Sequence, residues 1–153
     1  MWPPMARPMW PRMAEPDVVE EVTEANAAFY RCFETGDLDG MQDMWLDDAQ
    51  SLCVHPGARP VRGTSAINRS WALIMANTPY IQFFLTDVEV SVRGDVASVT
   101  CTENVLTAGE VADAAFTGAQ AVATNVFWRT PEGWRLWIHH ASPVLSGQHH
   151  DDD

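Results

Sequence analysis

The spacing of apolar side chains predicts helices in the first half of the chain and strands in the second. Up to about residue 78, apolar residues recur every three to four positions, as in helices with one buried face. From residue 81 onward, apolar and polar residues alternate, which is typical of half-buried strands. Helices followed by a strand meander indicate an α+β fold.

The helical half divides into three predicted segments. The first helix opens at its predicted cap Asp17 and ends at Thr35-Gly36. Asp37 is the predicted cap of a second, shorter helix, and Thr64 or Ser65 that of a third. The predicted buried faces are Val18, Val22, Ala25, Phe29, Cys32 and Phe33 in the first helix, Leu38, Met41 and Trp45 in the second, and Ile67, Trp71, Ile74 and Met75 in the third.

The strand half is predicted to form a meander joined by tight turns. One short strand over 50–54 precedes the third helix, and a loop over 107–118 interrupts the meander. A sheet covered on one face by helices leaves a gap between the layers, and such gaps become pockets. The predicted long strands cover 81–92, with a bend near 86, then 96–106, 120–129 and 134–141.

The chain ends differ from the middle in composition. Residues 1–16 hold five of the ten prolines and are predicted to form a flexible arm without a continuous apolar signal segment. Residues 17–145 form the predicted folded domain, and 146–153 a disordered polar tail.

Overall charge narrows the range of partners. The net charge of −12 argues against nucleic acids and anionic membranes, which both need clustered cations. Apolar runs are also far too short to span a membrane. Cys32, Cys53 and Cys101 form no CxxC pair, so we expect buried, reduced thiols in a cytoplasmic protein. No cofactor is expected.

Glu103 stands in an otherwise apolar row of its strand. It alternates onto the same face as Val99, Cys101 and Val105. If this face meets the helices, the carboxylate is buried and needs a hydrogen bond, a cation or water. Alternatively, Glu103 lies at the mouth of a pocket and meets solvent.

The last predicted strand carries a histidine pair. His140 shares the more apolar face with Trp134, Leu136 and Ile138, so it is predicted to point inward, as a catalyst or as a satisfied core residue. In the preceding strand, alternation does not choose between the face of Asn125 and its opposite.

If Asn125 faces inward, two tryptophans lie on the outer face of the sheet. These are Trp128 and Trp137, and exposed tryptophans on one sheet face suggest a homodimer interface.

Several stretches together resemble the SnoaL-like group of the NTF2-like superfamily, which includes ketosteroid isomerases, polyketide cyclases and dehydratases. The resemblance implies a cone in which a strongly curved, mostly antiparallel sheet wraps three helices around an internal pocket, commonly as a dimer. The matching stretches are Phe29-Tyr30-Arg31, Thr35 to Asp39, Met44 to Ala49, His55-Pro56-Gly57, Arg62-Gly63 and Gly133 to Ser142.

The resemblance also implies site positions. His55-Pro56 stands where ketosteroid isomerases keep an Asp-Pro general base. The place of their oxyanion-hole Tyr falls on Phe29, next to Tyr30, and that of their Asp falls on Asn125. Because Phe29 cannot donate a hydrogen bond, the usual oxyanion hole is absent. Pocket positions implied in the same way, or by strand alternation, are Trp45, Trp71, Cys101 and Ile138.

Three functional hypotheses stay open at this point. In the first, a small apolar carbonyl compound undergoes isomerisation, cyclisation or dehydration, with His55 as the base. Asn125 or Tyr30 would polarise the carbonyl, and Glu103 or His140 would orient His55. In the second, the chain is a non-catalytic small-molecule binding or dimeric assembly module. In the third, His55, His140 and Glu103 hold a metal ion.

Overall fold

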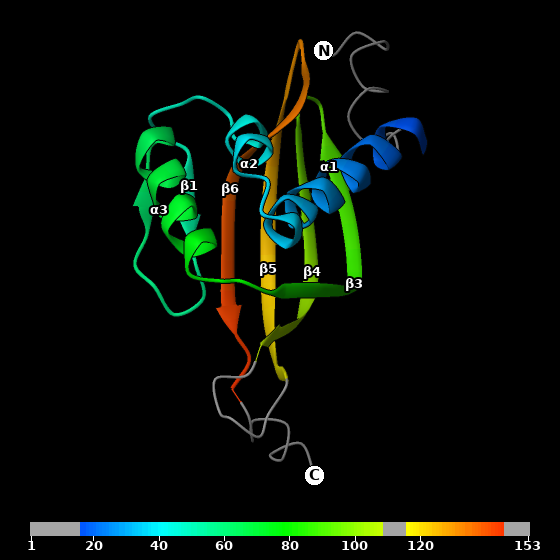
Figure 1. Cartoon of the computed structure of the whole chain (residues 1–153). Coiled ribbons are helices and arrows are strands. Elements are labelled where there is room, and N and C mark those ends of the chain that lie inside the picture. Colours follow the sequence, from blue (N-terminus) through cyan, green and yellow to red (C-terminus); the bar gives the residue numbers. More distant parts are fainter. Residues whose placement is uncertain (1–15, 109–115, 146–153) are drawn as a thin grey trace, which may run out of the picture.

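The computed structural model describes residues 16–108 and 116–145. Within these ranges, three helices accompany one six-stranded sheet with the order β2-β1-β6-β5-β4-β3, so the predicted α+β class is confirmed (Figure 1). The elements are α1 (Pro16–Thr35), α2 (Leu38–Met44), β1 (Leu52–Val54), β2 (Val61–Arg62), α3 (Thr64–Ala76), β3 (Ile81–Arg93), β4 (Val96–Ala108), β5 (Phe116–Thr130) and β6 (Gly133–Pro143).

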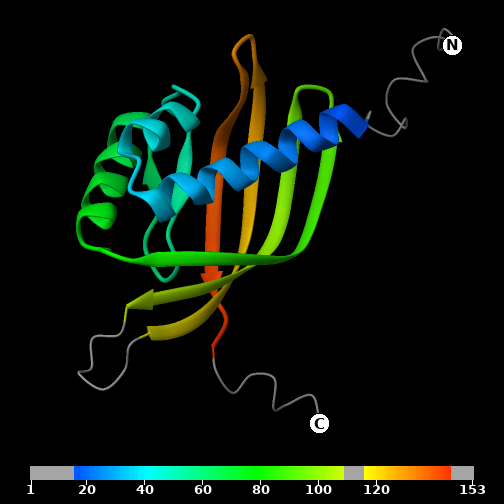
Figure 2. The same cartoon turned by 45° about the vertical axis from the view of Figure 1, so that its right-hand side comes forward.

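The sheet curves around the helices, which lie on one of its faces (Figure 1). Figure 2 shows the first part of β3 crossing beneath the helices, while the far ends of β4 and β5 bend the same way. The bend in β3 falls at a register shift between Thr86 and Glu89, where Asp87 takes a positive φ of 55°. Such an irregularity sharpens the local bend of a strand, and it lies where the sequence predicts one.

Strands β3 to β6 form the predicted antiparallel meander. Strand β1 adds to it in parallel, with Cys53 beside His139 and Val54 beside His140. Alternation along the sequence does not reveal this pairing, because about 80 residues separate the two strands in sequence. The pairing of β1 with β6 places the loop that begins at His55 next to the last strand.

The helix starts differ from the predictions in two cases. Asp37 caps α2 as expected, since its Oδ1 accepts a hydrogen bond from Gly40 N at 2.9 Å. Helix α1 begins at Pro16, a residue favoured at the first helical position, so Asp17 lies in the first turn rather than at the cap. Helix α3 is capped by Gly63 at φ 86°, and Thr64 Oγ1 instead accepts from Asp48 N at 2.8 Å.

Two strands extend into the predicted loop over 107–118, because β4 continues to Ala108 and β5 starts at Phe116. Apart from Pro16, the predicted arm and tail lie outside the described residues. Among the described helices, none has the length and apolarity needed to cross a membrane.

Candidate functional site

A cavity of about 340 Å³ lies between α1, α3 and the inner face of the sheet. Its size is at the lower end of small-molecule pockets, which span about 300–1,000 Å³. The lining is largely apolar but contains five polar or titratable side chains, which are Tyr30, His55, Glu103, Gln120 and His139. The apolar lining includes Phe29, Phe33, Trp71, Ile74, Ile81, Phe83 and Val105.

The polar side of the cavity is a hydrogen-bonded chain that crosses α1 and three strands. The Tyr30 hydroxyl donates to Glu103 Oε2 at 2.6 Å. Asn125 Nδ2 donates to the Tyr30 hydroxyl at 3.1 Å and to Asn26 Oδ1 at 2.8 Å. Asn125 Oδ1 lies 2.6 Å from His139 Nδ1. All five residues are buried, so each polar group depends on these partners.

The chemistry of each group fixes the direction of the chain. An amide oxygen can only accept, so His139 Nδ1 carries the proton that it donates to Asn125, and Nε2 is left as an acceptor. Tyr30 receives one bond from Asn125 and gives its own proton to Glu103. The donors therefore run from His139 through Asn125 and Tyr30 to Glu103, and Asn125 also donates to Asn26 as a side branch.

Burial governs the ionisation of this chain. It lowers the pKa of His139 to about 3, with further lowering from the nearby His55 and His140. Burial also raises the pKa of Glu103, and the hydrogen bond from Tyr30 offsets part of that shift. The pKa of Tyr30 is raised, first by burial and then by the charge of Glu103, so its phenol stays protonated.

His55 opens the loop after β1 and is half-buried. The Ser70 hydroxyl donates to Ile67 O at 2.7 Å, so it accepts a hydrogen bond from His55 Nε2 at 3.1 Å. The remaining ring nitrogen, Nδ1, is then unprotonated, and its only polar contact among the described residues is the Cys53 thiol at 3.9 Å. Burial lowers the pKa of His55, and the Trp71 ring lies 4.8 Å away. The imidazole is thus neutral and held in one tautomer.

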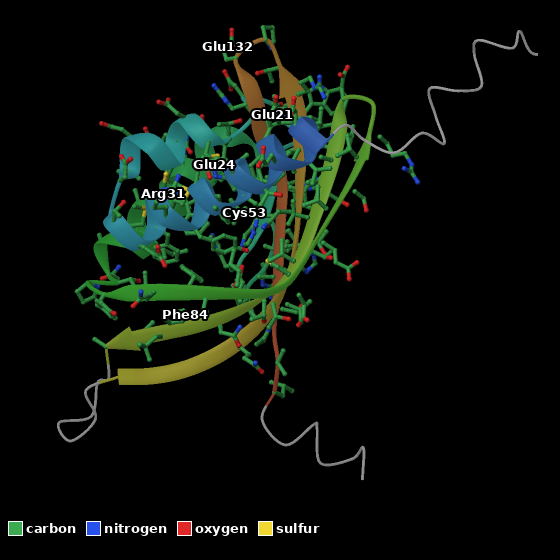
Figure 3. The ribbon with its side chains drawn as sticks, turned by 90° about the vertical axis from the view of Figure 1, so that its right-hand side faces the viewer. Glu21, Glu24, Arg31, Cys53, Phe84 and Glu132 are labelled. Carbon is green, nitrogen blue, oxygen red and sulfur yellow. The ribbon has the colours of Figure 1, made fainter. Side chains whose placement is uncertain are left out.

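The three cysteines are free, as expected. Cys53 and Cys101 are buried, whereas Cys32 is only partly buried. Burial raises the pKa of the Cys53 thiol to about 12, so it is not a thiolate nucleophile near neutral pH. In Figure 3, Cys53 lies between the helices and the sheet.

Five of the sequence-predicted residues line the cavity. They are Phe29, Tyr30, His55, Trp71 and Glu103. Of the two positions left open for Glu103, the structure selects the buried one, since only 4% of the residue is exposed and its Oε2 is bonded to Tyr30.

The other predicted positions lie elsewhere. Asn125 faces inward but sits behind Tyr30 and His139, where it joins them. Trp45 and Cys101 are buried without lining the cavity, and Ile138 does not line it either.

The predicted inward direction of His140 is wrong, and a bulge in β6 is the reason. Val126 pairs with Ile138 whereas Phe127 pairs with Leu136, so Trp137 is an extra residue in the strand. Every later side chain of β6 therefore changes face, and His139 is buried while His140 is exposed. Periodicity gives the wrong histidine because it assumes an unbroken strand.

Sequence reasoning also missed Asn26 and Phe33. Asn26 precedes Tyr30 by four residues, so both lie on the same face of α1 and reach Asn125 together. This i, i+4 spacing was the available signal for Asn26. Phe33 was predicted to be a core residue but lines the cavity.

No three His, Cys, Asp or Glu side chains gather as metal ligands in the described part of the chain. The hypothetical triad of His55, Glu103 and His140 is not assembled, because His140 points away from the interior.

Comparison with known proteins places this geometry in a family. The chain matches a model of the SnoaL-like domain over residues 22–146. A solved protein from Streptomyces avermitilis, described as a proposed dehydratase of the NTF2-like family, is 51% identical with a TM-score of 0.81, and the match covers 86% of this chain and 100% of that one. No curated protein matches.

More distant solved structures share the fold. A proposed calcium/calmodulin-dependent protein kinase type II association domain from Thiobacillus denitrificans is 29% identical with a TM-score of 0.70, over 87% of this chain and 98% of that one. A proposed aromatic ring hydroxylase from Novosphingobium aromaticivorans is 18% identical with a TM-score of 0.75, over 87% and 93%.

The curved sheet that wraps around the helices, together with the similar solved structures, defines an NTF2-like domain. Within that class, the chain belongs to the SnoaL-like domain family.

Proposed function

We propose that the cavity binds a small, largely apolar carbonyl compound and that the protein transfers a proton at the carbon next to the carbonyl. One observation carries this proposal. Two neutral imidazoles, His55 and His139, line the same apolar cavity, and each donates one N–H to a fixed partner, which leaves the other nitrogen to accept a proton.

In this mechanism His55 is the base. Nδ1 of His55 takes the proton from carbon while Ser70 holds the opposite nitrogen, so the ring keeps its orientation as it becomes an imidazolium. His139 lies on the strand next to that of His55, and Asn125 fixes its ring as Ser70 fixes that of His55. Because the pKa of His139 is lowered to about 3, its Nε2 serves as a hydrogen-bond acceptor for the ligand and not as a second base.

Among isomerisation, cyclisation and dehydration, we favour dehydration of a β-hydroxy carbonyl compound. The proposed dehydratase activity of the 51% identical relative supports this choice. The double bond forms as the C–O bond breaks, and the departing hydroxide takes the proton from the imidazolium to leave as water.

The test uses solvent deuterium, because exchange reports proton removal even where no product forms. β-Hydroxy ketones and simple ketones are incubated with the protein in D₂O, and deuterium next to the carbonyl is measured by mass spectrometry. We expect incorporation by the native chain and a loss of about 10²–10⁴-fold in His55→Gln. His140→Gln, on the outer face, is the matched control and should exchange normally. Equal exchange in His55→Gln and the native chain would remove His55 from the mechanism.

A non-catalytic binding role is the second candidate. In the hydrogen-bonded chain, Tyr30 already donates its hydroxyl proton to Glu103, and Asn125 donates both amide protons to Asn26 and Tyr30. Neither group is then left to polarise a ligand carbonyl, which supports this role. This role predicts ligands that raise the melting temperature and are recovered unmodified. Recovery of a chemically altered ligand would contradict it.

We also propose a homodimer through the outer face of the sheet. Trp128 is 39% exposed and stacks edge-on with Trp137 at 5.5 Å, and Phe84 and Val122 are also exposed on strands of this face. Figure 3 shows Phe84 on the side of β3 away from the helices. Analytical ultracentrifugation should give a dimer for the native chain and a monomer for Trp128→Glu.

A further inference from the structure

The lining of the cavity contains an acidic side chain but no cationic one among the described residues. Glu103 is the single charged side chain in its lining among the described residues, since His55 and His139 are neutral. The chain contains nine arginines and no lysine, and none of the described arginines lines the cavity. The negative charge of Glu103 therefore has no cationic partner in the described part of the protein.

The hydrogen bond from Tyr30 favours the anionic form of Glu103, although burial still holds the pKa of this carboxyl group above its ordinary value. His139, Asn125 and Tyr30 donate in sequence, and the last donor gives its proton to Glu103 Oε2 at 2.6 Å. Donation to the charged form of a carboxyl group favours that form. The other oxygen, Oε1, has no hydrogen-bond partner among the described residues, although 96% of the residue is buried, as its exposure of 4% shows. Oε1 is not among the fully buried side-chain atoms that lack a partner, and Glu103 lines the cavity, so a cationic ligand there can donate to this oxygen.

The walls beside Glu103 are aromatic. Tyr30 and Phe83 have ring centroids 4.9 Å apart, and Phe33 follows at 5.5 Å from Phe83 and 5.1 Å from Trp71. The faces of such rings attract cations, and several rings around one site recognise organic ammonium groups. The net charge of −12 adds a long-range field that favours cations and repels anions.

We propose that the natural ligand of this cavity carries a protonated aliphatic amine, which pairs with Glu103 while its apolar part packs among Phe33, Trp71 and Phe83. This inference rests on the binding half of the proposed function and does not depend on proton transfer. It names a substrate class, an apolar amine, and excludes carboxylates and phosphates.

The experiment compares three ligands that share one skeleton and differ in charge. They are 2-aminotetralin, 2-tetralol and tetralin-2-carboxylate, measured by isothermal titration calorimetry at pH 7. With the native chain we expect the amine to bind at least about tenfold more tightly than the alcohol, and the carboxylate not to bind. Equal affinity of amine and alcohol, or no binding of any of the three, would overturn the inference.

Two variants assign the preference to one residue. Glu103→Gln should remove the advantage of the amine while leaving alcohol affinity unchanged. Glu89→Gln changes the net charge equally at an exposed position of β3 and should keep the full preference. An amine preference that survives Glu103→Gln would contradict the proposal. The ligand ranking on the native chain tests the inference even if Glu103→Gln fails to fold.

The outcomes also separate this inference from the proposed chemistry. Tight amine binding without deuterium exchange in any carbonyl compound would support the amine as ligand class and contradict the proposed proton transfer. Exchange in neutral ketones without an amine preference would do the reverse.

Discussion

Two halves of the same interior are built on opposite principles. The closed half, toward the β5–β6 hairpin, contains Val22, Met41, Phe127 and Leu136, all with 0% exposure and all apolar. The open half is equally buried but contains Asn26, Tyr30, Glu103, Asn125 and His139, joined by hydrogen bonds around the cavity.

Helix α1 passes through both halves, so the difference does not come from separate elements. Val22 belongs to the closed half, and Asn26 begins the open half one helical turn later. Apolar packing stabilises the fold wherever it occurs, whereas buried polar groups at best compensate for their desolvation. We infer that the closed half stabilises the domain and that the open half is retained for its ligand.

Leu136→Ala should lower the free energy of unfolding by about 2–5 kcal/mol, because it leaves a cavity in the closed half. Urea denaturation monitored by tryptophan fluorescence measures this loss. Leu73→Ala on α3, where the side chain is exposed, is the control and should change stability by less than about 0.5 kcal/mol. A small loss for Leu136→Ala would mean that the closed half is not the stabilising one.

Tyr30→Phe should lower the free energy of unfolding by about 1–3 kcal/mol, since it removes the donor to Glu103 and leaves Asn125 short of an acceptor. It should also raise the pKa of Glu103 further, because that hydrogen bond favours the carboxylate. Carbon-13 NMR titration of the Glu103 carboxyl group measures the shift. A lower pKa of Glu103 in Tyr30→Phe would contradict the assignment of Tyr30 as the hydrogen-bond donor to Glu103.

Acid should destabilise the protein through His139. Its folded pKa, lowered to about 3, lies below the ordinary value of 6.5, so its stabilising contribution is present above pH 6.5 and is lost as the pH falls toward 3. One proton gives a slope of at most about 1.4 kcal/mol per pH unit. Denaturation midpoints across this range should fall less steeply in His139→Gln than in the native chain.

Glu103 has the opposite sign and must be separated from this effect. Its folded pKa is raised, so its contribution is present at low pH and is lost as the pH rises through the folded pKa. The difference between His139→Gln and the native chain isolates the histidine. Identical pH slopes in the two proteins would show that His139 takes up no proton on unfolding.

His140→Gln should have the smallest effect, with a stability change below about 0.5 kcal/mol, because His140 is exposed. The same measurements that test His139 check this. A large effect of His140→Gln would contradict the facing of β6 described here.

The sequence was sufficient for the fold and for one part of the candidate site. Alternation in β4 is unbroken between Val99 and Glu103, so it correctly puts these two residues on one face, and the structure selects the buried one of the two positions left open for Glu103. On β5, alternation did not decide which of the two faces points inward, and the structure shows that the face of Asn125 does.

The remainder depends on features that no local pattern contains. The choice between His139 and His140 depends on a bulge, which is set by pairing with β5 rather than by the residues of β6 alone. The bonds from Asn26 and Tyr30 to Asn125 join residues 99 and 95 positions apart, and sequence spacing cannot measure such separations. Phe29 and Tyr30 are both buried, so counting positions along α1 could not assign the role of Tyr30.

The bulge at Trp137 also has a consequence for the history of the domain. If β6 had no bulge, the pairing of Phe127 with Leu136 would continue to pair Asn125 with Ile138 and Ala123 with His140, so His140 would replace His139 on the inner side but would not meet Asn125. Removing Trp137 from the chain would instead leave His139 in place. The two adjacent histidines therefore leave an imidazole on the inner face of β6 in either register, but only the register with the bulge places it opposite Asn125.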